Sequence, residues 1–235
     1  MKHAAYCGTR NVYGDMETSA KSLVANSDVE VVHFFIEDAE FPHELPNIVQ
    51  CHDVSRQEFF PPDGANAKSQ YTYMTLMRAA LCHLLPDVDE VLSLDCDTIA
   101  VGYCSDVWDI DVDGCYFAAS QEKWLRRPGT QYCNTGVSLF NLAKLRDGKA
   151  DEIIDVLNRR YFRWPEQDVM NFLCQGRIAE MDSAYNFCPW TVAPHKTVRI
   201  VHYAAREDWR GEQIVLKYRE MSWDEAARLH ECLEC

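Results

Sequence analysis

A short apolar run that ends in two aspartates, Asp95 and Asp97, constrains this chain more than any other stretch. Val91, Leu92 and Leu94 before them are typical of a short buried strand. Residues i and i+2 of an extended chain point to the same side, so the pattern predicts two carboxylates directed at one site. Neighbouring carboxylates repel each other unless a cation neutralises them, and Mg²⁺ and Mn²⁺ prefer oxygen ligands. Taken alone, the pair is equally typical of solvated aspartates in a turn or at a helix N-cap.

The length and charge of the chain limit what it can be. Its 235 residues suffice for one well-buried α/β domain, and no linker, repeat or low-complexity segment divides them. We therefore predict a single domain over residues 1–235. The 37 Asp and Glu residues outnumber the 23 Lys and Arg residues, and the net charge is −14. This charge disfavours nucleic acid or an anionic membrane surface as the main partner. A phosphate-bearing ligand would need both a metal ion and locally placed Arg or Lys side chains.

The 11 cysteines and the apolar segments predict the cellular compartment of the protein. An odd number of cysteines at irregular spacing predicts reduced thiols rather than a disulfide framework. The N-terminus turns polar by Gly8, too early for the apolar core of a signal peptide, and no apolar run is long enough to span a membrane. We therefore expect a cytoplasmic protein without a membrane span.

The order of the predicted elements is typical of a nucleotide-binding α/β sheet. An apolar segment at 4–7, a polar loop, a helix at 18–26 and a strand at 29–36 predict a ligand at the first loop, although a GxGxxG fingerprint is absent. Arg78 lies on the apolar stripe of a helix predicted over 70–85. A buried arginine needs a partner, either an anionic ligand or a structural carboxylate. Further strands are expected at 47–54, 116–119, 137–140, 177–181 and 198–203, and further helices at 151–160, 165–174 and 222–234.

Four sequence blocks add a family resemblance to this pattern. They are Leu92–Thr98 with Asp106–Asp109, Asn134–Val137 with Phe140–Leu142, Glu166–Asp168 with Asn171, and His202–Ala204 with Trp209. In this order they resemble the DxD block and three later motifs of the family 8 glycosyltransferases, retaining enzymes that include glycogenin and bacterial lipopolysaccharide galactosyltransferases. A single DxD is weak evidence, whereas four blocks in the order of the family over about 200 residues are strong evidence.

The resemblance implies a fold, a donor and a metal ion. The fold would be of GT-A type, an α/β nucleotide-sugar-binding fold with a central mixed, mainly parallel sheet flanked by helices. The donor would be a UDP-hexose carrying glucose or galactose, and the acceptor a glycan, lipid or protein. Asp95, Asp97 and His202 would bind Mn²⁺ or Mg²⁺, which would also hold the donor diphosphate and act as a Lewis acid on the leaving UDP.

The resemblance also assigns residues to the parts of the donor. Thr9, Asn11 and Tyr13 would hold the uridine, with Tyr13 stacked on uracil. Asn134 and Glu166 would bind the sugar hydroxyls. The expected donor-binding residues are Thr9, Asn11, Tyr13, Arg78, Asp95, Cys96, Asp97, Asn134, Gly136, Glu166, Gln167, His202 and Arg206.

Gln167, Glu166 and Arg78 are the expected catalytic residues. Gln167 would lie nearest the anomeric carbon, on the face opposite UDP. Because an amide is a poor nucleophile, front-face transfer through an oxocarbenium-like state is favoured over a glycosyl-enzyme intermediate. Arg78 would stabilise the charge that develops on the leaving diphosphate.

Two departures from the family pattern keep alternatives open. The closing motif has Ala205 in place of a glycine and Glu207 in place of a diphosphate-binding lysine, so Arg206 would have to compensate. A sugar-nucleotide-binding protein without turnover is therefore one alternative. A DxD phosphohydrolase is less favoured, because Thr98 stands one place early for its motif and the strand is not the first. The acceptor would bind on loops such as 59–67, 121–131 and 187–195.

Overall fold

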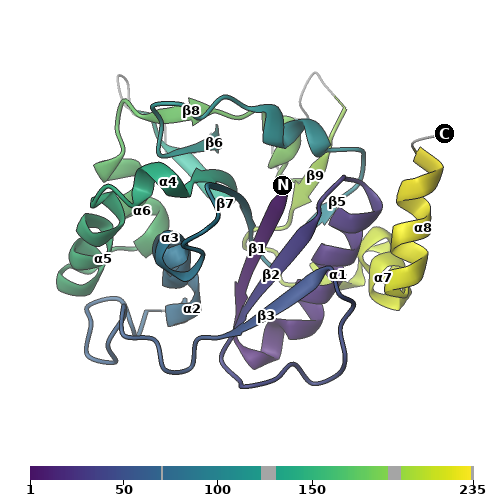
Figure 1. The fold of residues 1–235 in the computed structure, drawn as a ribbon, viewed down its shortest axis with the longest axis horizontal. Coiled ribbons are helices and arrows are strands. Elements are labelled where there is room, and N and C mark those ends of the chain that lie inside the picture. Colours follow the sequence, from purple (N-terminus) through teal and green to yellow (C-terminus); the bar gives the residue numbers. More distant parts are fainter. Residues whose placement is uncertain (70, 123–130, 190–196, 234–235) are drawn as a thin grey trace.

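The computed structural model describes residues 1–69, 71–122, 131–189 and 197–233. A seven-stranded sheet forms its centre, with the strand order β3-β2-β1-β4-β7-β6-β8 (Figure 1). Four strand pairs of this sheet are parallel, and the two pairs that involve β7 are antiparallel. The predicted mixed, mainly parallel sheet is therefore confirmed. Its strands are β1 (His3–Gly8), β2 (Val31–Ile36), β3 (Val49–Asp53), β4 (Glu90–Leu94), β6 (Phe117–Gln121), β7 (Cys133–Asn141) and β8 (Ile178–Glu180).

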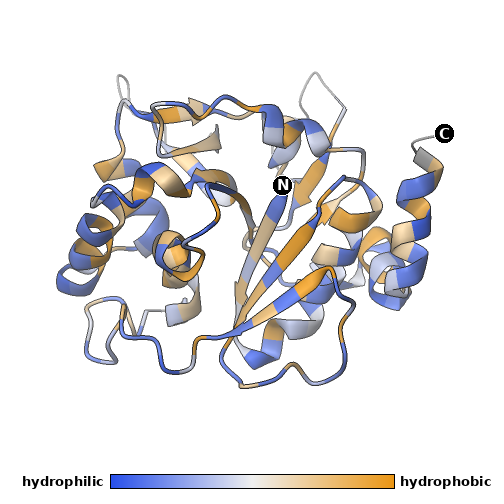
Figure 2. Cartoon of the chain, viewed as in Figure 1, coloured by the Kyte–Doolittle hydropathy of each residue, from blue (hydrophilic) through white to orange (hydrophobic). Residues whose placement is uncertain are grey.

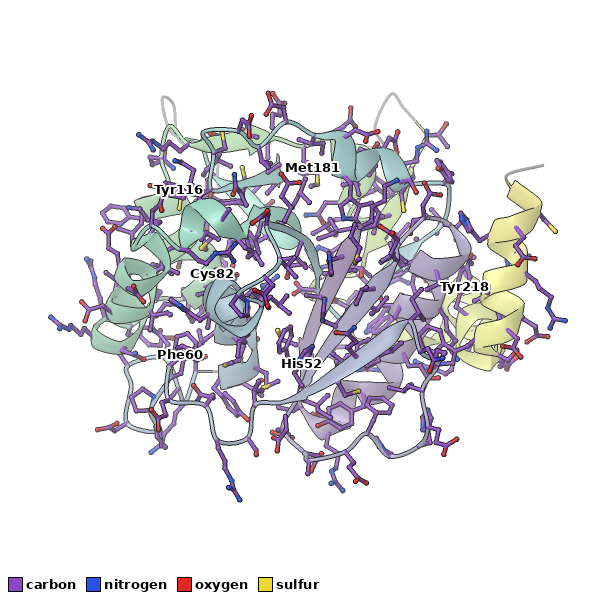
Figure 3. All side chains as sticks on the ribbon, viewed as in Figure 1. His52, Phe60, Cys82, Tyr116, Met181 and Tyr218 are labelled. Atoms are coloured by element: carbon purple, nitrogen blue, oxygen red, sulfur yellow. The ribbon has the colours of Figure 1, made fainter. Side chains whose placement is uncertain are left out.

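Helices cover both faces of this sheet. One face packs against α1 (Tyr13–Ala25), α7 (Gln213–Glu220) and α8 (Trp223–Leu233), which lie together at one side of Figure 1. The other face packs against α2 (Tyr73–Leu76), α3 (Leu81–Leu84), α4 (Leu142–Leu145), α5 (Lys149–Arg159) and α6 (Pro165–Leu173). Figure 3 shows this division, with Tyr218 on the side of α1 and both Phe60 and Cys82 on the side of α2 and α3.

The strand β2 illustrates why the sheet is buried on both faces. Phe34 faces the core on the side of α1, Phe35 faces the core on the side of α2 and α3, and neither is exposed. Burying such a side chain fully contributes about 1.5–3 kcal/mol. A parallel strand covered on both sides needs apolar residues at nearly every position, and Figure 2 shows β2 as mostly hydrophobic.

Several predicted boundaries differ from the structure. The helix predicted over 70–85 consists of α2 and α3 joined by a 3₁₀ turn at Met77–Ala80, and residue 70 lies outside the described residues. Every residue from Leu76 to Cys82 is buried, so packing on several sides sets the local pitch instead of one apolar stripe. The helix predicted from Thr18 begins at Tyr13, and it includes Gly14, a residue that disfavours helix, in its first turn. The short elements β5 (Thr98–Ala100), α4 and α7 were not predicted.

The cysteines and the helix lengths agree with two expectations from the sequence. All ten cysteines for which the structure gives a state are free thiols. Within the described ranges, no helix combines the length and the apolar character that crossing a membrane requires.

Three histidines form a hydrogen-bonded row across the edge of the sheet. His3 Nδ1 lies 3.0 Å from His33 Nε2, and His33 Nδ1 lies 3.0 Å from His52 Nε2. Burial lowers the pKa of His33 from 6.5 to about 3, and the neighbouring His52 and His3 add to this effect. His33 therefore stays neutral in the folded protein at a pH where it takes up a proton in the unfolded chain.

We expect this row to make the fold sensitive to acid. Because the folded pKa of His33 is below the unfolded value, its contribution is complete above pH 6.5 and is lost as the pH falls towards 3. Between about pH 7 and pH 4.5 the loss should be about 2–3 kcal/mol. Urea denaturation across this range, compared between wild type and His33→Gln, measures it. His83→Gln is the control, because His83 is paired with Asp151 outside the row. An unchanged pH slope in His33→Gln would contradict the prediction.

Candidate functional site

A cavity of about 610 Å³ lies where β1 and β4 end and α6 begins. Its wall is built from segments that are far apart in the sequence. The sequence-predicted residues in the wall are Thr9, Asn11, Arg78, Asp95, Cys96, Asp97, Asn134, Glu166, Gln167 and His202. Strand ends and helix starts meet at this edge of an α/β sheet, which is where such folds bind their ligands.

Asp95, Asp97 and His202 converge on one side of this cavity. The two aspartates lie in the turn between β4 and β5, and β5 pairs with β9 (Ile200–His202) so that His202 is opposite Thr98. His202 Nε2 lies 3.4 Å from Asp95 Oδ2 and 3.4 Å from Asp97 Oδ1. One ligand atom from each residue fits within 4.8 Å of the others. The carboxylates converge because of the turn and not because of strand alternation, but they do face one site.

The electrostatics of this triad suit a cation. Burial alone would lower the pKa of His202, but the Asp97 and Asp95 carboxylates outweigh burial and raise that pKa well above 6.5. Burial raises the pKa of Asp95, yet the Arg78 and His202 charges leave it below its ordinary value. Two carboxylate oxygens and one imidazole nitrogen are ligands that Mn²⁺ and Mg²⁺ sites use, so the residues present fit such an ion.

Arg78 joins this triad to the start of α6. Its Nη1 lies 3.0 Å from Asp95 Oδ1 and donates to the carbonyl of Thr135 at 2.6 Å, and its Nη2 donates to Glu166 Oε2 at 2.9 Å. The side chains of Arg78 and Glu166 are 6% and 1% exposed. The sequence predicted that Arg78 pairs with either an anionic ligand or a structural carboxylate, and the structure contains the carboxylate. Glu166 Oε1 is buried without a hydrogen-bond partner among the described residues, so this wall of the cavity retains an unused acceptor.

Gln167 and Asn134 lie in the cavity wall with their amides already engaged. Gln167 Oε1 accepts from the Thr135 N–H at 3.1 Å, and its Nε2 donates to the Tyr132 hydroxyl at 3.2 Å. Asn134 Nδ2 donates to Glu122 Oε2 at 3.1 Å. Both amides therefore have fixed orientations before any ligand binds.

Three residues expected at the donor lie outside the cavity wall as the structure describes it. The Tyr13 side chain is 3% exposed, with its ring stacked on Phe41 at 5.1 Å, so it does not offer a face to uracil. Arg206 pairs with Asp208 at 2.8 Å and with Glu212 at 2.6 Å. Gly136 lies behind His202 and makes room for the imidazole ring. In this structure Tyr13, Arg206 and Gly136 therefore do not contribute to the cavity wall.

Sequence reasoning missed a second arginine in the wall. Arg210 lines the cavity and its side chain is 47% exposed. The buried Asp15 carboxylate holds it through contacts of 2.6–3.1 Å and is also bound by Arg219 at 3.1 Å. Arg210 directly follows Trp209 of the fourth sequence block, which was the available signal. Asn186, whose side chain contacts His202, lies in none of the sequence motifs.

The closing segment of the chain shows the effect of its departures from the family pattern. Ala205 has φ of 59°, and it is the one non-glycine residue with positive φ in the part of the chain that the structure describes. A glycine adopts this left-handed conformation more readily, and for an alanine it costs roughly 1–2 kcal/mol. Glu207 is exposed and is not among the residues of the cavity wall.

Comparisons with known proteins identify relatives of this chain. The model of the family named Glycosyl transferase family 8 matches residues 3–210. The chain is 26% identical to glycosyltransferase GlyE of Streptococcus pneumoniae over 147 residues, which cover 60% of this chain and 34% of GlyE. It is 30% identical to the lipopolysaccharide 1,2-glucosyltransferase of Escherichia coli over 113 residues, or 42% of this chain and 33% of that enzyme.

Solved structures show the same architecture. The galactosyltransferase LgtC in complex with donor and acceptor sugar analogs superposes with a TM-score of 0.72 at 20% identity, over 92% of this chain and 95% of LgtC. GlyE superposes with a TM-score of 0.74 at 19% identity, over 99% of this chain and 63% of GlyE. The fold is thus the GT-A fold of these glycosyltransferases. The chain spans 59% of a Haemophilus influenzae relative that is 23% identical, and about a third of the two relatives above.

Proposed function

This chain belongs to glycosyl transferase family 8, and from that premise we propose that it is a metal-dependent, retaining hexosyltransferase. Its donor would be a UDP-sugar carrying glucose or galactose, and its acceptor a glycan, lipid or protein. The observation that carries the proposal is the convergence of Asp95, Asp97 and His202 beside Arg78 and Glu166 in one cavity. We propose further that residues 1–235 form one transferase domain and that the protein is located in the cytoplasm.

The residues of the site suggest how each would act on such a donor. Asp95, Asp97 and His202 would hold Mn²⁺ or Mg²⁺, which when bound supplies Lewis-acid stabilisation of the diphosphate leaving group. Thr9 and Asn11 remain the candidates for uridine, because both line the cavity. The unused Glu166 Oε1 would accept a hydrogen bond from a sugar hydroxyl. Gln167 would face the anomeric carbon, and its fixed amide would stabilise positive charge there.

The two alternatives lose support from the geometry. A phosphohydrolase needs one aspartate as a free nucleophile, but Asp95 contacts both Arg78 and His202. The threonine of its motif, Thr98, donates its hydroxyl to the Asp95 carbonyl at 2.8 Å. The protein without turnover was suggested by Glu207, whose side chain does not contribute to the cavity wall.

Turnover of a panel of UDP-sugars with Mn²⁺ tests the proposal. Slow release of UDP without an acceptor, abolished by EDTA and restored by Mn²⁺, is the expected result. Release of inorganic phosphate would indicate a hydrolase, and binding without turnover would indicate the degenerate protein. The anomeric proton of the transfer product, read by NMR, should show the α configuration of the donor. A β-linked product would contradict retention.

The acceptor loops are only partly described. Residues 123–130 and 190–195 of the expected loops lie outside the described residues. The described loop 59–67 does not contribute to the cavity wall. Direct screening with candidate glycans, lipids and proteins identifies the acceptor.

We expect Arg210, and not Arg206, to bind the donor diphosphate. Arg210 lines the cavity and is oriented by Asp15, whereas the Arg206 guanidinium faces Asp208 and Glu212. A hydrogen bond to a charged group is worth about 1.5–3 kcal/mol, so Arg210→Ala should weaken UDP binding about tenfold or more. Arg206→Ala should change it less than about twofold. Calorimetric titration with UDP and Mn²⁺ compares the two, and the reverse ranking would contradict the assignment.

A further inference from the structure

A chain of polar side chains leads from the rim of the cavity to the back of His202. Glu122 Oε2 accepts from Asn134 Nδ2 at 3.1 Å. Asn134 Oδ1 accepts from Asn186 Nδ2 at 3.0 Å, and Asn186 Oδ1 lies 2.8 Å from His202 Nδ1. The four residues come from the end of β6, from β7, from the segment after the 3₁₀ turn Ser183–Tyr185, and from β9. None of these contacts is a backbone hydrogen bond of a strand or a helix.

The donor and the acceptor of each hydrogen bond in this network can be assigned, because two of its groups can act in only one way. An ionised Glu122 can only accept, and the Gly136 N–H, which donates to Asn134 Oδ1 at 3.0 Å, can only donate. Together they fix which end of the Asn134 amide is the oxygen. Asn186 Nδ2 contacts both the side-chain oxygen and the carbonyl of Asn134, so its own oxygen must face His202. An amide oxygen only accepts, and His202 Nδ1 must therefore carry the proton.

This tautomer is the one that a metal ligand needs. With the Nδ1 proton held by Asn186, Nε2 is the nitrogen that can give up its proton and supply a lone pair to an ion, and Nε2 lies 3.4 Å from an oxygen of Asp95 and from one of Asp97. The backbone of His202 is fixed by the hydrogen bond from its N–H to the Phe187 carbonyl at 2.9 Å, and with 2% of the residue exposed the ring has little freedom to rotate. Asn186 itself is 7% exposed, so water does not readily replace it.

We propose that Asn186 is a positioning residue that holds His202 with Nε2 towards the metal site, and that Asn134 and Glu122 set the orientation of Asn186. This inference rests on the proposed function, because it needs the ion that Asp95 and Asp97 would share with His202. It gives Asn134 a role different from the sugar contact expected from the sequence. Neither Asn186 nor Glu122 carries a motif that would have predicted this role.

Metal affinity measured without donor or turnover tests the proposal. The Kd for Mn²⁺, from the electron paramagnetic resonance of free Mn²⁺, should rise about 10–100-fold in Asn186→Ala. Asn186→Asp should regain part of the affinity, because its carboxylate still accepts from Nδ1 but its second oxygen can no longer donate to Asn134. Asn66→Ala is the matched control, because Asn66 is equally buried and bridges two segments, through Leu157 and Arg160, away from His202. It should lower the melting temperature and leave the Kd within about twofold.

A second measurement needs no variant. Nitrogen-15 NMR of histidine-labelled wild type with Mg²⁺ should show His202 with a proton on Nδ1 and none on Nε2. The opposite tautomer would overturn the proposal, as would a folded Asn186→Ala protein that binds Mn²⁺ as tightly as wild type. A wild-type protein that binds neither ion would instead remove the metal from the proposed function, and this inference with it. The two failures are therefore distinguishable.

Discussion

Asp97→Asn is expected to reduce UDP release by about 10³-fold or more, because loss of a charged metal ligand forfeits several kcal/mol of leaving-group stabilisation. The fold should survive this change. Asp97 lies at the cavity in the turn after β4, and the contact that organises its backbone is the hydrogen bond from the Tyr203 N–H to its carbonyl at 2.9 Å. The amide of asparagine keeps the shape of the side chain and leaves that backbone contact in place. Steady-state UDP release and thermal melting, measured on the same preparations, separate the two effects.

Asp95→Asn should differ from Asp97→Asn in a defined way. Asp95 also lies 3.0 Å from the buried Arg78, so its neutralisation leaves that guanidinium with one charged partner fewer. The Asp95 variant should therefore lose activity and also melt at a lower temperature. Asp113→Asn, at an exposed residue outside the cavity, is the control for the general effect of removing a charge. Wild-type activity in excess EDTA, or an Asp97→Asn protein with normal turnover, would contradict the metal-dependent reaction.

The central strands β1, β2 and β4 were predictable because they are apolar over most of their length. Val31–Ile36 is buried on both faces, and such a run has few alternatives in an α/β protein. The short elements were not predictable for the opposite reason. Thr98–Ala100 has only three residues and becomes a strand because Ile200–His202 pairs with it from about a hundred residues away. With three residues, Thr98–Ala100 is too short to show a strand pattern of its own, whereas a strand over 198–203 was predicted for its partner.

The candidate site also contains some residues that could be predicted from the sequence and others that could not. Asp95, Asp97 and His202 were predictable because each lies within a motif, and the strand pairing then brings them together. Arg210 and Asn186 were not, because their roles depend on which group their side chains reach across the fold. Arg206 shows the converse case. Arg206 is positively charged and lies next to the motif that contains His202. Ion pairs with Asp208 and Glu212 nevertheless hold its guanidinium outside the cavity wall.

Gly136→Ala is expected to abolish metal binding although it adds a single methyl group outside the cavity. A Cβ at this position would lie 2.6 Å from His202 Nδ1 and 2.7 Å from Nε2, closer than any stable contact. A shift of the ring would break its contacts with Asn186 on one edge and with the two aspartates on the other. Either His202 leaves its place or β7 shifts, and overpacking of this kind costs about 1–3 kcal/mol. The Kd for Mn²⁺ should rise about 100-fold or more, as for loss of a ligand.

A double-mutant cycle identifies His202 as the cause of this effect. In a His202→Ala background the added methyl group meets no ring, so Gly136→Ala should no longer lower the free energy of unfolding. Gly14→Ala is the matched control, because a Cβ there would meet nothing within 4 Å and Gly14 lies in the helix α1. That change should leave the Kd unaltered and stabilise the fold by up to about 1 kcal/mol. If Gly136→Ala destabilises both backgrounds equally, the clash is with another part of the fold. His202 then does not occupy the place on which the metal site depends.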